Sequence, residues 1–313
     1  MARVIVVGAG VVGLSCAVRL VEAGHQVDVV ARDLPLETTS AVAAALWYPY
    51  RAFPFERVTA WSHASYVELT ELAEVDGPEQ TGVRMLHGTE LHRARTADPW
   101  WRDAVPALTR VAPVGPPYVD GWSFVAPIIE MPVYLSWLAK RVESMGATIT
   151  RMALGALPDH AEVVVNATGL GARRTADDPS VMPVRGQVVY LEQIGLDHWW
   201  LDSGAPGGPV YVVPRSHDIV VGGTDDEGEW DRRPDPDVAK LILERAVEVV
   251  PHLGRARVVG HKVGLRPGRP EVRLEEQSLG DTRVVHCYGH GGAGVTLSWG
   301  CADEVATLVG PPA

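Results

Sequence analysis

The chain has 313 residues, which is enough to bury a large core and fits roughly two domains or one large one. Its 28 Lys and Arg stand against 39 Asp and Glu, and the net charge of −11 argues against nucleic acid or an anionic membrane as the main partner. No apolar run approaches the roughly 18 residues of a membrane-spanning helix, and the first residues lack a basic signal-peptide region. We therefore expect a soluble, cytoplasmic protein.

The cysteines give no sign of a disulfide framework or a metal site. Cys16, Cys287 and Cys301 are odd in number, far apart in the sequence and never spaced as CxxC. The histidines also lack ligand spacing. We expect free buried thiols and no metal.

The first elements form a β-α-β unit. Arg3 to Val7 is a β-branched run, Val11 to Glu22 is typical of a helix, and Val27 to Val30 returns as a strand. Three later segments continue the same pattern, a helix and then two strands: Pro132 to Ser144, Ala147 to Arg151, and Glu162 to Val165. A cofactor domain built from separate stretches of chain is therefore expected.

The rest of the chain suggests a second, antiparallel layer. Pro, Gly and Trp are common from Asp98 to Pro127, which favours isolated strands and turns. Strands are predicted at Gln187 to Leu191, Val210 to Val213 and Ile219 to Gly222, with an amphipathic helix over Asp237 to Val250.

The pattern Gly8-Ala9-Gly10-Val11-Val12-Gly13 follows the first strand and opens the first helix. In this context Gly8 permits a tight turn, Gly10 lets a pyrophosphate approach the backbone, and Gly13 lets helix and strand pack closely. A glycine-rich turn without a ligand is the alternative. The pattern alone does not separate NAD from FAD.

The acidic residue expected at the end of the second strand is absent, because that strand continues as Ala31-Arg32-Asp33. We expect Arg32 and Asp33 to supply the adenosine contacts instead. A solvated charge pair is the other reading.

A second glycine-rich turn, His286 to Thr296, precedes a predicted helix over Leu297 to Leu308. A second helix N-terminus aimed at one cofactor would stabilise negative charge on a reduced flavin. Two such turns favour FAD over NAD.

Six motifs in this order make the chain resemble the D-amino-acid oxidase family over almost its whole length. They are Thr38 to Tyr50 (TTSAVAAALWYPY), Val165 to Gly169 (VNATG), Arg185-Gly186-Gln187, Gly222-Gly223-Thr224, Gly264-Leu265-Arg266-Pro267 and Tyr288 to Gly292 (YGHGG). The resemblance implies a Rossmann-like FAD-binding domain, doubly wound and mainly parallel, with an α+β substrate domain built on a large antiparallel sheet. We place the FAD-binding domain at 1–50, 132–180 and 262–313, and the substrate domain at 51–131 and 181–261.

The resemblance also implies the substrate contacts. Arg266 occupies the carboxylate-binding position, and a guanidinium can hold a carboxylate through two charge-assisted hydrogen bonds. Tyr211 matches the active-site tyrosine, and the Gly292 carbonyl would accept from the substrate amine. Read without the family, Arg266 could be a surface ion pair and Tyr211 a buried strand aromatic.

For non-covalently bound FAD, the family positions fall on both glycine turns and on hydroxyl groups suited to phosphate or ribose. The matching residues are Gly8, Gly10, Val11, Val12, Gly13, Arg32, Asp33, Thr38, Thr39, Ser40, Ala45, Leu46, Met152, Thr168, Gly291, Gly292, Ala293, Gly294, Val295 and Thr296. N-capping or turn bonds are the alternative role of these hydroxyls.

Two departures from the family bear on substrate choice. Where mammalian members carry a lid tyrosine, this chain has Gly207 in a short turn, so we expect a reduced lid and easier product release. Asp225 and Asp226 follow Gly222-Gly223-Thr224 where D-aspartate oxidases carry an arginine, so acidic substrates should be repelled.

The resemblance therefore implies oxidation of neutral, or also basic, D-amino acids. Hydride would pass from the α-carbon to flavin N5, giving a 2-oxo acid, ammonia and, with oxygen, hydrogen peroxide. The alternatives are a glycine or sarcosine oxidase-like amine oxidase, a flavin-binding protein without turnover, and an NAD-dependent dehydrogenase. The sequence leaves a homodimer open.

Overall fold

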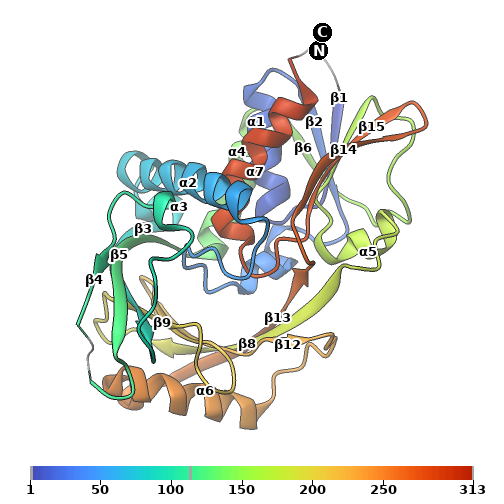
Figure 1. Cartoon of the computed structure of the whole chain (residues 1–313). Helices are drawn as coiled ribbons and strands as arrows, with labels where there is room; N and C mark the ends of the chain where they lie inside the picture. Colours follow the sequence, from blue (N-terminus) through green and yellow to red (C-terminus); the bar gives the residue numbers. More distant parts are fainter. Residues whose placement is uncertain (1–2, 113–114, 312–313) are drawn as a thin grey trace.

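A computed structural model describes residues 3–112 and 115–311 of the chain. Two sheets dominate it, one above the other in Figure 1, with helices on the outer side of each. The start of β1 and the end of α7 lie at the end of the upper layer that points away from the lower sheet. No helix of the described ranges is long and apolar enough to cross a membrane.

The upper sheet has six strands in the order β14-β15-β7-β1-β2-β6. Their bounds are β1 Arg3–Val7, β2 Gln26–Ala31, β6 Thr148–Arg151, β7 Val163–Asn166, β14 Arg273–Leu279 and β15 Thr282–Tyr288. All neighbouring pairs are parallel except β14 and β15. Buried β-branched residues fill the central strands, as a sheet covered on both faces requires.

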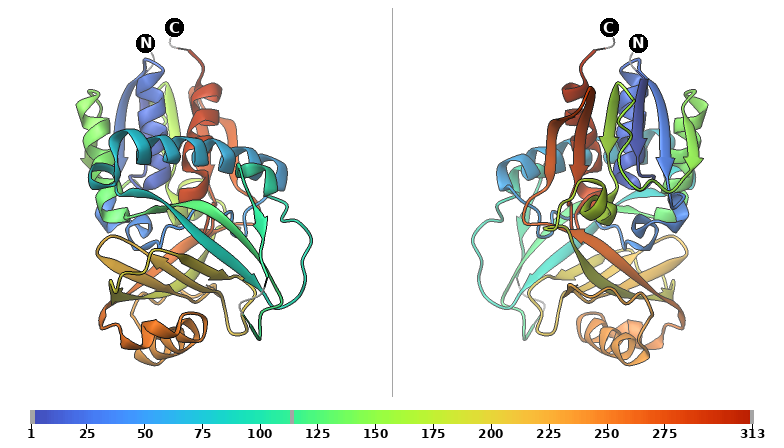
Figure 2. Two further views of the ribbon diagram at one scale, coloured as in Figure 1. Left: turned by 90° about the vertical axis from the view of Figure 1, so that its left-hand side faces the viewer. Right: turned by 90° about the vertical axis from the view of Figure 1, so that its right-hand side faces the viewer.

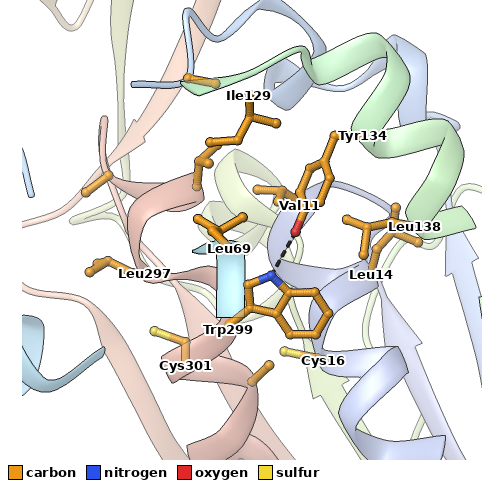
Figure 3. Packing of buried hydrophobic residues seen from close by; sticks show 14 of the residues in the cluster. Val11, Leu14, Cys16, Leu69, Ile129, Tyr134, Leu138, Leu297, Trp299 and Cys301 are labelled. Carbon is orange, nitrogen blue, oxygen red and sulfur yellow. Dashed lines mark hydrogen bonds between the residues drawn. The ribbon is translucent and has the colours of Figure 1, made fainter. Parts of the chain in front are cut away.

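The helices have the following bounds: α1 Val11–Glu22, α2 Phe55–Glu71, α3 Pro78–Thr81, α4 Met131–Ser144, α5 Ala172–Thr175, α6 Pro236–Val249 and α7 Gly294–Val309. On one side of the upper sheet, α1 packs against both α4 and α7. Figure 3 shows the centre of this layer, where Trp299 of α7 donates to the Tyr134 hydroxyl of α4 at 2.8 Å. Both rings are fully buried, so truncating either should cost about 3–5 kcal/mol.

Helix α2 crosses α7 closely, and the sequence patterns gave no prediction for it. A Cβ on Gly300 would lie 2.4 Å from the Cα of Trp61, so only glycine allows this crossing. Ser65 Oγ also accepts from the N–H groups of Trp299 and Gly300.

The lower sheet has nine strands, in the order β12-β8-β11-β10-β9-β3-β5-β4 with β13 also paired to β8. Their bounds are β3 Val83–His92, β4 Thr109–Arg110, β5 Asp120–Ile129, β8 Met182–Glu192, β9 Trp199–Asp202, β10 Val210–Pro214, β11 Asp218–Gly222, β12 Asp226–Glu227 and β13 Val258–Gly268. All pairs are antiparallel except β3 with β9. Helix α6 covers the outer face, where Ile242 packs among strand valines, as the side views in Figure 2 show.

The fold class expected from the sequence is confirmed. The proposed domain boundary at residue 262, however, falls inside β13, which pairs with β8 from Val258 to Gly268. The antiparallel layer therefore continues to residue 268 before the chain returns to the upper sheet. Helix α2, inside the expected substrate segment 51–131, packs against the upper layer.

Candidate active site

A cavity of about 1010 Å³ lies where the carboxyl ends of the upper strands meet the lower sheet. Its lining extends from Arg32 and Asp33 after β2 to Tyr211 on β10 and Arg266 on β13. A volume of this size suits a large cofactor together with a small substrate. The cavity brings together all the predicted site residues except Ala293 and Thr296.

Ala293 and Thr296 are buried instead, at the N-terminal end of α7, where each bonds to backbone groups of the protein. The Ala293 N–H donates to the His290 carbonyl at 3.0 Å. Thr296 Oγ1 accepts from the Tyr48 N–H and donates to the Tyr48 carbonyl. These two residues therefore support the cavity wall at the start of α7 without lining the cavity.

The first glycine turn has the close approaches that its spacing predicts. A Cβ on Gly8, where φ is +119°, would lie 2.3 Å from the Ala167 carbonyl oxygen. A Cβ on Gly13 would lie 2.0 Å from the Gly8 oxygen. Larger residues at either position would push β1, β7 and α1 apart, so the turn fits a backbone cradle for a pyrophosphate.

Two helix N-termini face this cavity. Helix α1 begins after Gly10, and the Val11 N–H donates to Ser40 Oγ at 3.1 Å, which leaves the hydroxyl proton of Ser40 for a ligand. Helix α7 begins at Gly294, not at Leu297 as predicted. Gly294 and Val295, which line the cavity, therefore lie in its first turn, where N–H groups have no partner within the helix.

The threonine hydroxyls expected to hold FAD already donate to the protein. Thr38 Oγ1 donates to the Pro35 carbonyl at 2.7 Å and Thr39 Oγ1 to the Leu265 carbonyl at 3.1 Å. Thr168 Oγ1 donates to Asn166 Oδ1 at 2.7 Å. Toward a ligand these oxygens can still accept, so they suit ribose hydroxyls better than phosphate oxygens.

Arg32 and Asp33 pair with each other at 2.5 Å at the rim of the cavity. Their hydrogen bond raises the pKa of Arg32 and lowers that of Asp33, so both groups are charged. The pair is exposed, as its alternative reading expected, yet it also lines the cavity. An acceptor carboxylate remains available for a ribose there.

Arg266 is held in place from two sides. Its Nη1 donates to the Thr224 carbonyl at 2.9 Å and lies 3.9 Å from Asp225 Oδ1. Its guanidinium covers Gly186, where a Cβ would lie 2.3 Å from Nη2. The arginine still borders the cavity, so its remaining N–H groups can donate hydrogen bonds to a carboxylate.

Tyr211 stands beside Arg266 in the cavity and lies over Gly222, where a Cβ would approach its Cζ to 2.1 Å. Burial raises the pKa of Tyr211, while Arg266 acts in the opposite direction. The hydroxyl is therefore protonated and can donate to a carboxylate. Gly292 completes this end, since a Cβ built on it would lie 3.6 Å from Arg266 Cδ.

Tyr50 and Arg51 join the site, although sequence reasoning gave them no role. The Tyr50 hydroxyl donates to Asp225 Oδ2 at 2.8 Å, and Arg51 pairs with the same oxygen. Together with Trp100 they line a second cavity of about 440 Å³ that adjoins the first at Tyr48 and Tyr50. The one sequence signal for a role in the site was the position of Tyr50 at the end of the Thr38 to Tyr50 motif.

The two aspartates expected to repel acidic substrates lie apart. Asp225 is mostly buried beside Arg266, but the side chain of Asp226 is half exposed and lies 3.4 Å from Arg185. Of these two aspartates, only Asp225 lies close enough to Arg266 to affect a substrate bound there.

The turn between β9 and β10, where the family lid was expected to be reduced, is short and anchored. Arg245 of α6 donates to the Gly208 carbonyl at 3.0 Å and to the Gly223 carbonyl at 2.9 Å. This bridge ties the turn to the segment that carries Thr224.

The fold brings together cysteines that are distant in sequence. The ligand atoms of Cys287, His290 and Cys301 all lie within 4.8 Å of one another in the core, a set that could hold a metal ion. Sequence spacing could not reveal it. For each cysteine a hydrogen bond from a neighbouring thiol lowers the pKa, yet burial contributes to a net rise in both pKa values, so the thiols are protonated.

Comparison with known proteins agrees with this geometry. A family model described as FAD dependent oxidoreductase matches residues 3–308. A D-amino-acid oxidase of Rubrobacter xylanophilus is 49% identical over 99% of this chain and 96% of its own length. One of Streptomyces coelicolor is 43% identical over 98% and 96%. The solved glycine oxidase of Geobacillus kaustophilus, 22% identical, superposes with a TM-score of 0.81 over 99% of this chain and 95% of that one, which supports the fold.

FAD fits the cavity, because glycines open the backbone at the first turn and two helix N-termini face it. The match extends over nearly the whole chain, and the relatives are matched over nearly their full length. The chain belongs to the DAO family of FAD-dependent oxidoreductases.

Proposed function

We propose that this enzyme oxidises neutral, and also basic, D-amino acids to 2-oxo acids and ammonia. The observation that carries the proposal is the pairing of Arg266 and Tyr211 in the cavity, each placed over a glycine. A fixed guanidinium and a protonated hydroxyl side by side are the groups that bind an amino-acid carboxylate. The names of the relatives support the same substrate class.

Asp225 supports the choice of side chain. Its carboxylate lies 3.9 Å from Arg266 and borders the second cavity. An acidic substrate side chain near it would be repelled, whereas a cationic one would be attracted.

In this proposal bound FAD would supply the acceptor for the hydride of the substrate α-carbon and the route by which the electrons reach oxygen, with hydrogen peroxide as the second product. The main contribution of the protein side chains is to position the substrate, not to transfer a proton. Arg266 and Tyr211 fix the carboxylate, and the Gly292 carbonyl accepts from the amine. When the carboxylate and the amine are both held, one enantiomer directs its α-hydrogen toward a given cavity wall and the other directs its side chain there. Only one enantiomer can therefore place its α-hydrogen for reaction.

The substrate range is tested with a panel of D-methionine, D-valine, D-lysine, D-aspartate, glycine and sarcosine, measured as kcat/KM for peroxide release. We expect the neutral D-amino acids to be best and D-aspartate to be poor. Glycine or sarcosine above every D-amino acid would replace this proposal with an amine oxidase of that kind. D-aspartate above D-valine would contradict the role of Asp225.

A further inference from the structure

The segment between β12 and α6, Gly228–Asp235, carries two side chains into the cofactor cavity. Trp230 and Arg232 both line the cavity, although they lie in the loop that follows β12 of the lower sheet and not in either glycine turn. Trp230 is 53% exposed, which is high for such a large apolar residue. No motif had singled it out.

This segment is fastened to β8 by two buried polar side chains. Arg185 donates through Nε to the Asp231 carbonyl at 2.8 Å and through Nη2 to the Arg233 carbonyl at 2.9 Å. Gln187 donates to the Asp235 carbonyl at 2.7 Å and accepts from the Asp235 N–H at 2.9 Å. Gln187 is fully buried and Arg185 nearly so, so these bonds are protected from water.

The Arg185-Gly186-Gln187 motif thus serves two sites at once. Successive residues of a strand point to opposite faces. Gly186 makes room for Arg266 on the substrate face, while Arg185 and Gln187 hold Gly228–Asp235 from the other side. A rigid segment, rather than a loose one, carries Trp230.

Charge places the segment at the adenosine end of the cavity. Arg232 lines the same cavity as Arg32 and Asp33, which follow β2. The Arg32 hydrogen bond lowers the pKa of Asp33, and the charge of Arg232 contributes to the same shift. The residues after the second strand of a dinucleotide fold face the ribose. Trp230 is two residues from Arg232, at the same rim.

We propose that Trp230 packs against the adenosine portion of FAD, with Arg232 beside it, so that the lower sheet closes the outer end of the cofactor site. An indole offers a flat apolar face to an adenine, and such stacking contributes about fivefold to hundredfold in affinity when judged by truncation. The inference rests on FAD occupying the large cavity as described above.

The test uses the full chain stripped of flavin and titrated with FAD and with FMN, with binding followed by flavin fluorescence. Trp230→Ala should weaken FAD at least fivefold and leave FMN, which lacks the adenosine, unchanged. Trp230→Phe should recover most of the loss. Leu241→Ala removes another exposed large apolar side chain, on α6 and outside both cavities, and should leave both affinities unchanged.

Equal FAD affinity in Trp230→Ala and the parent chain would overturn the proposal, as would an equal loss of FAD and FMN. Neither result would touch the substrate range, which the amino-acid panel measures separately. A parent chain that binds no FAD would overturn this inference and the proposed function together.

Discussion

The guanidinium of Arg266 lies where a side chain on residue 186 would have to be, since a Cβ built on Gly186 falls 2.3 Å from its Nη2 atom. The atom in the way is the far end of a flexible side chain. Gly186→Ala should therefore displace Arg266 and cost the fold little. We expect KM for D-methionine to rise about tenfold or more, with the free energy of unfolding changed by about 1 kcal/mol or less.

Gly260→Ala is the matched control for that change, because nothing lies within 4 Å of its added Cβ. It should leave KM as it is. An unchanged KM in Gly186→Ala would show that Arg266 does not need this space to bind the carboxylate.

Tyr211→Phe removes a hydroxyl and keeps the ring over Gly222. Loss of one hydrogen bond to a charged carboxylate should lower kcat/KM about tenfold, with little change in stability. Tyr190→Phe also removes a buried hydroxyl, one that has no hydrogen-bond partner among the residues that the structure describes, and should leave kcat/KM unchanged. If both variants behave alike, Tyr211 has no part in binding substrate.

Asp225→Asn removes a negative charge 3.9 Å from Arg266 and keeps an acceptor for the Tyr50 hydroxyl. The ratio of kcat/KM for D-aspartate to that for D-methionine should rise about tenfold, since one repulsive charge is gone from a partly buried site. Asp226→Asn removes an equal charge at an exposed position and should not change the ratio. A ratio that rises equally in both would point to long-range charge and not to contact at Asp225.

The buried carboxyl of Glu90 should make the free energy of unfolding depend on pH. Burial raises its pKa to about 7, against hydrogen bonds from Tyr48 and Ser203 that lower it. The folded chain thus retains a proton that the unfolded chain releases near pH 4.5, so this carboxyl costs stability as pH rises from about 4.5 to 7. The cost levels off above pH 7 at about 3 kcal/mol.

Glu90→Gln should remove that slope. Chemical unfolding of both proteins from pH 4 to 8 measures it, with the difference between the two curves growing in favour of the variant up to pH 7. A constant difference across this range would mean that Glu90 is ionised throughout in the folded chain.

Most of the fold was predictable because its signals are local. Alternating and continuous apolar runs marked β1, β2, β7, β10 and β11, and glycine spacing located the turn before α1. Helix α2 was missed because tertiary contacts with α7, through Ser65 and Gly300, stabilise it. The start of α7 was placed three residues late because glycines in its first turn obscure the helical pattern.

The site residues that could be predicted are those in or beside recognisable sequence motifs. Arg266 and Tyr211 were found through resemblance, because nothing local separates them from a surface arginine or a core tyrosine. Tyr50 and Arg51 meet Asp225 from 174 or more residues away, which no spacing rule predicts. The same holds for Cys287 and Cys301, which share a cluster with His290 only after folding.

The proposed cofactor and substrate are tested most directly by mixing the purified protein with D-methionine, and separately with L-methionine, without oxygen, and recording the visible spectrum. We predict a yellow protein that is bleached by D-methionine and not by L-methionine, which would establish bound flavin, reaction and handedness together. Bleaching by L-methionine, or by neither enantiomer, would contradict the proposed substrate.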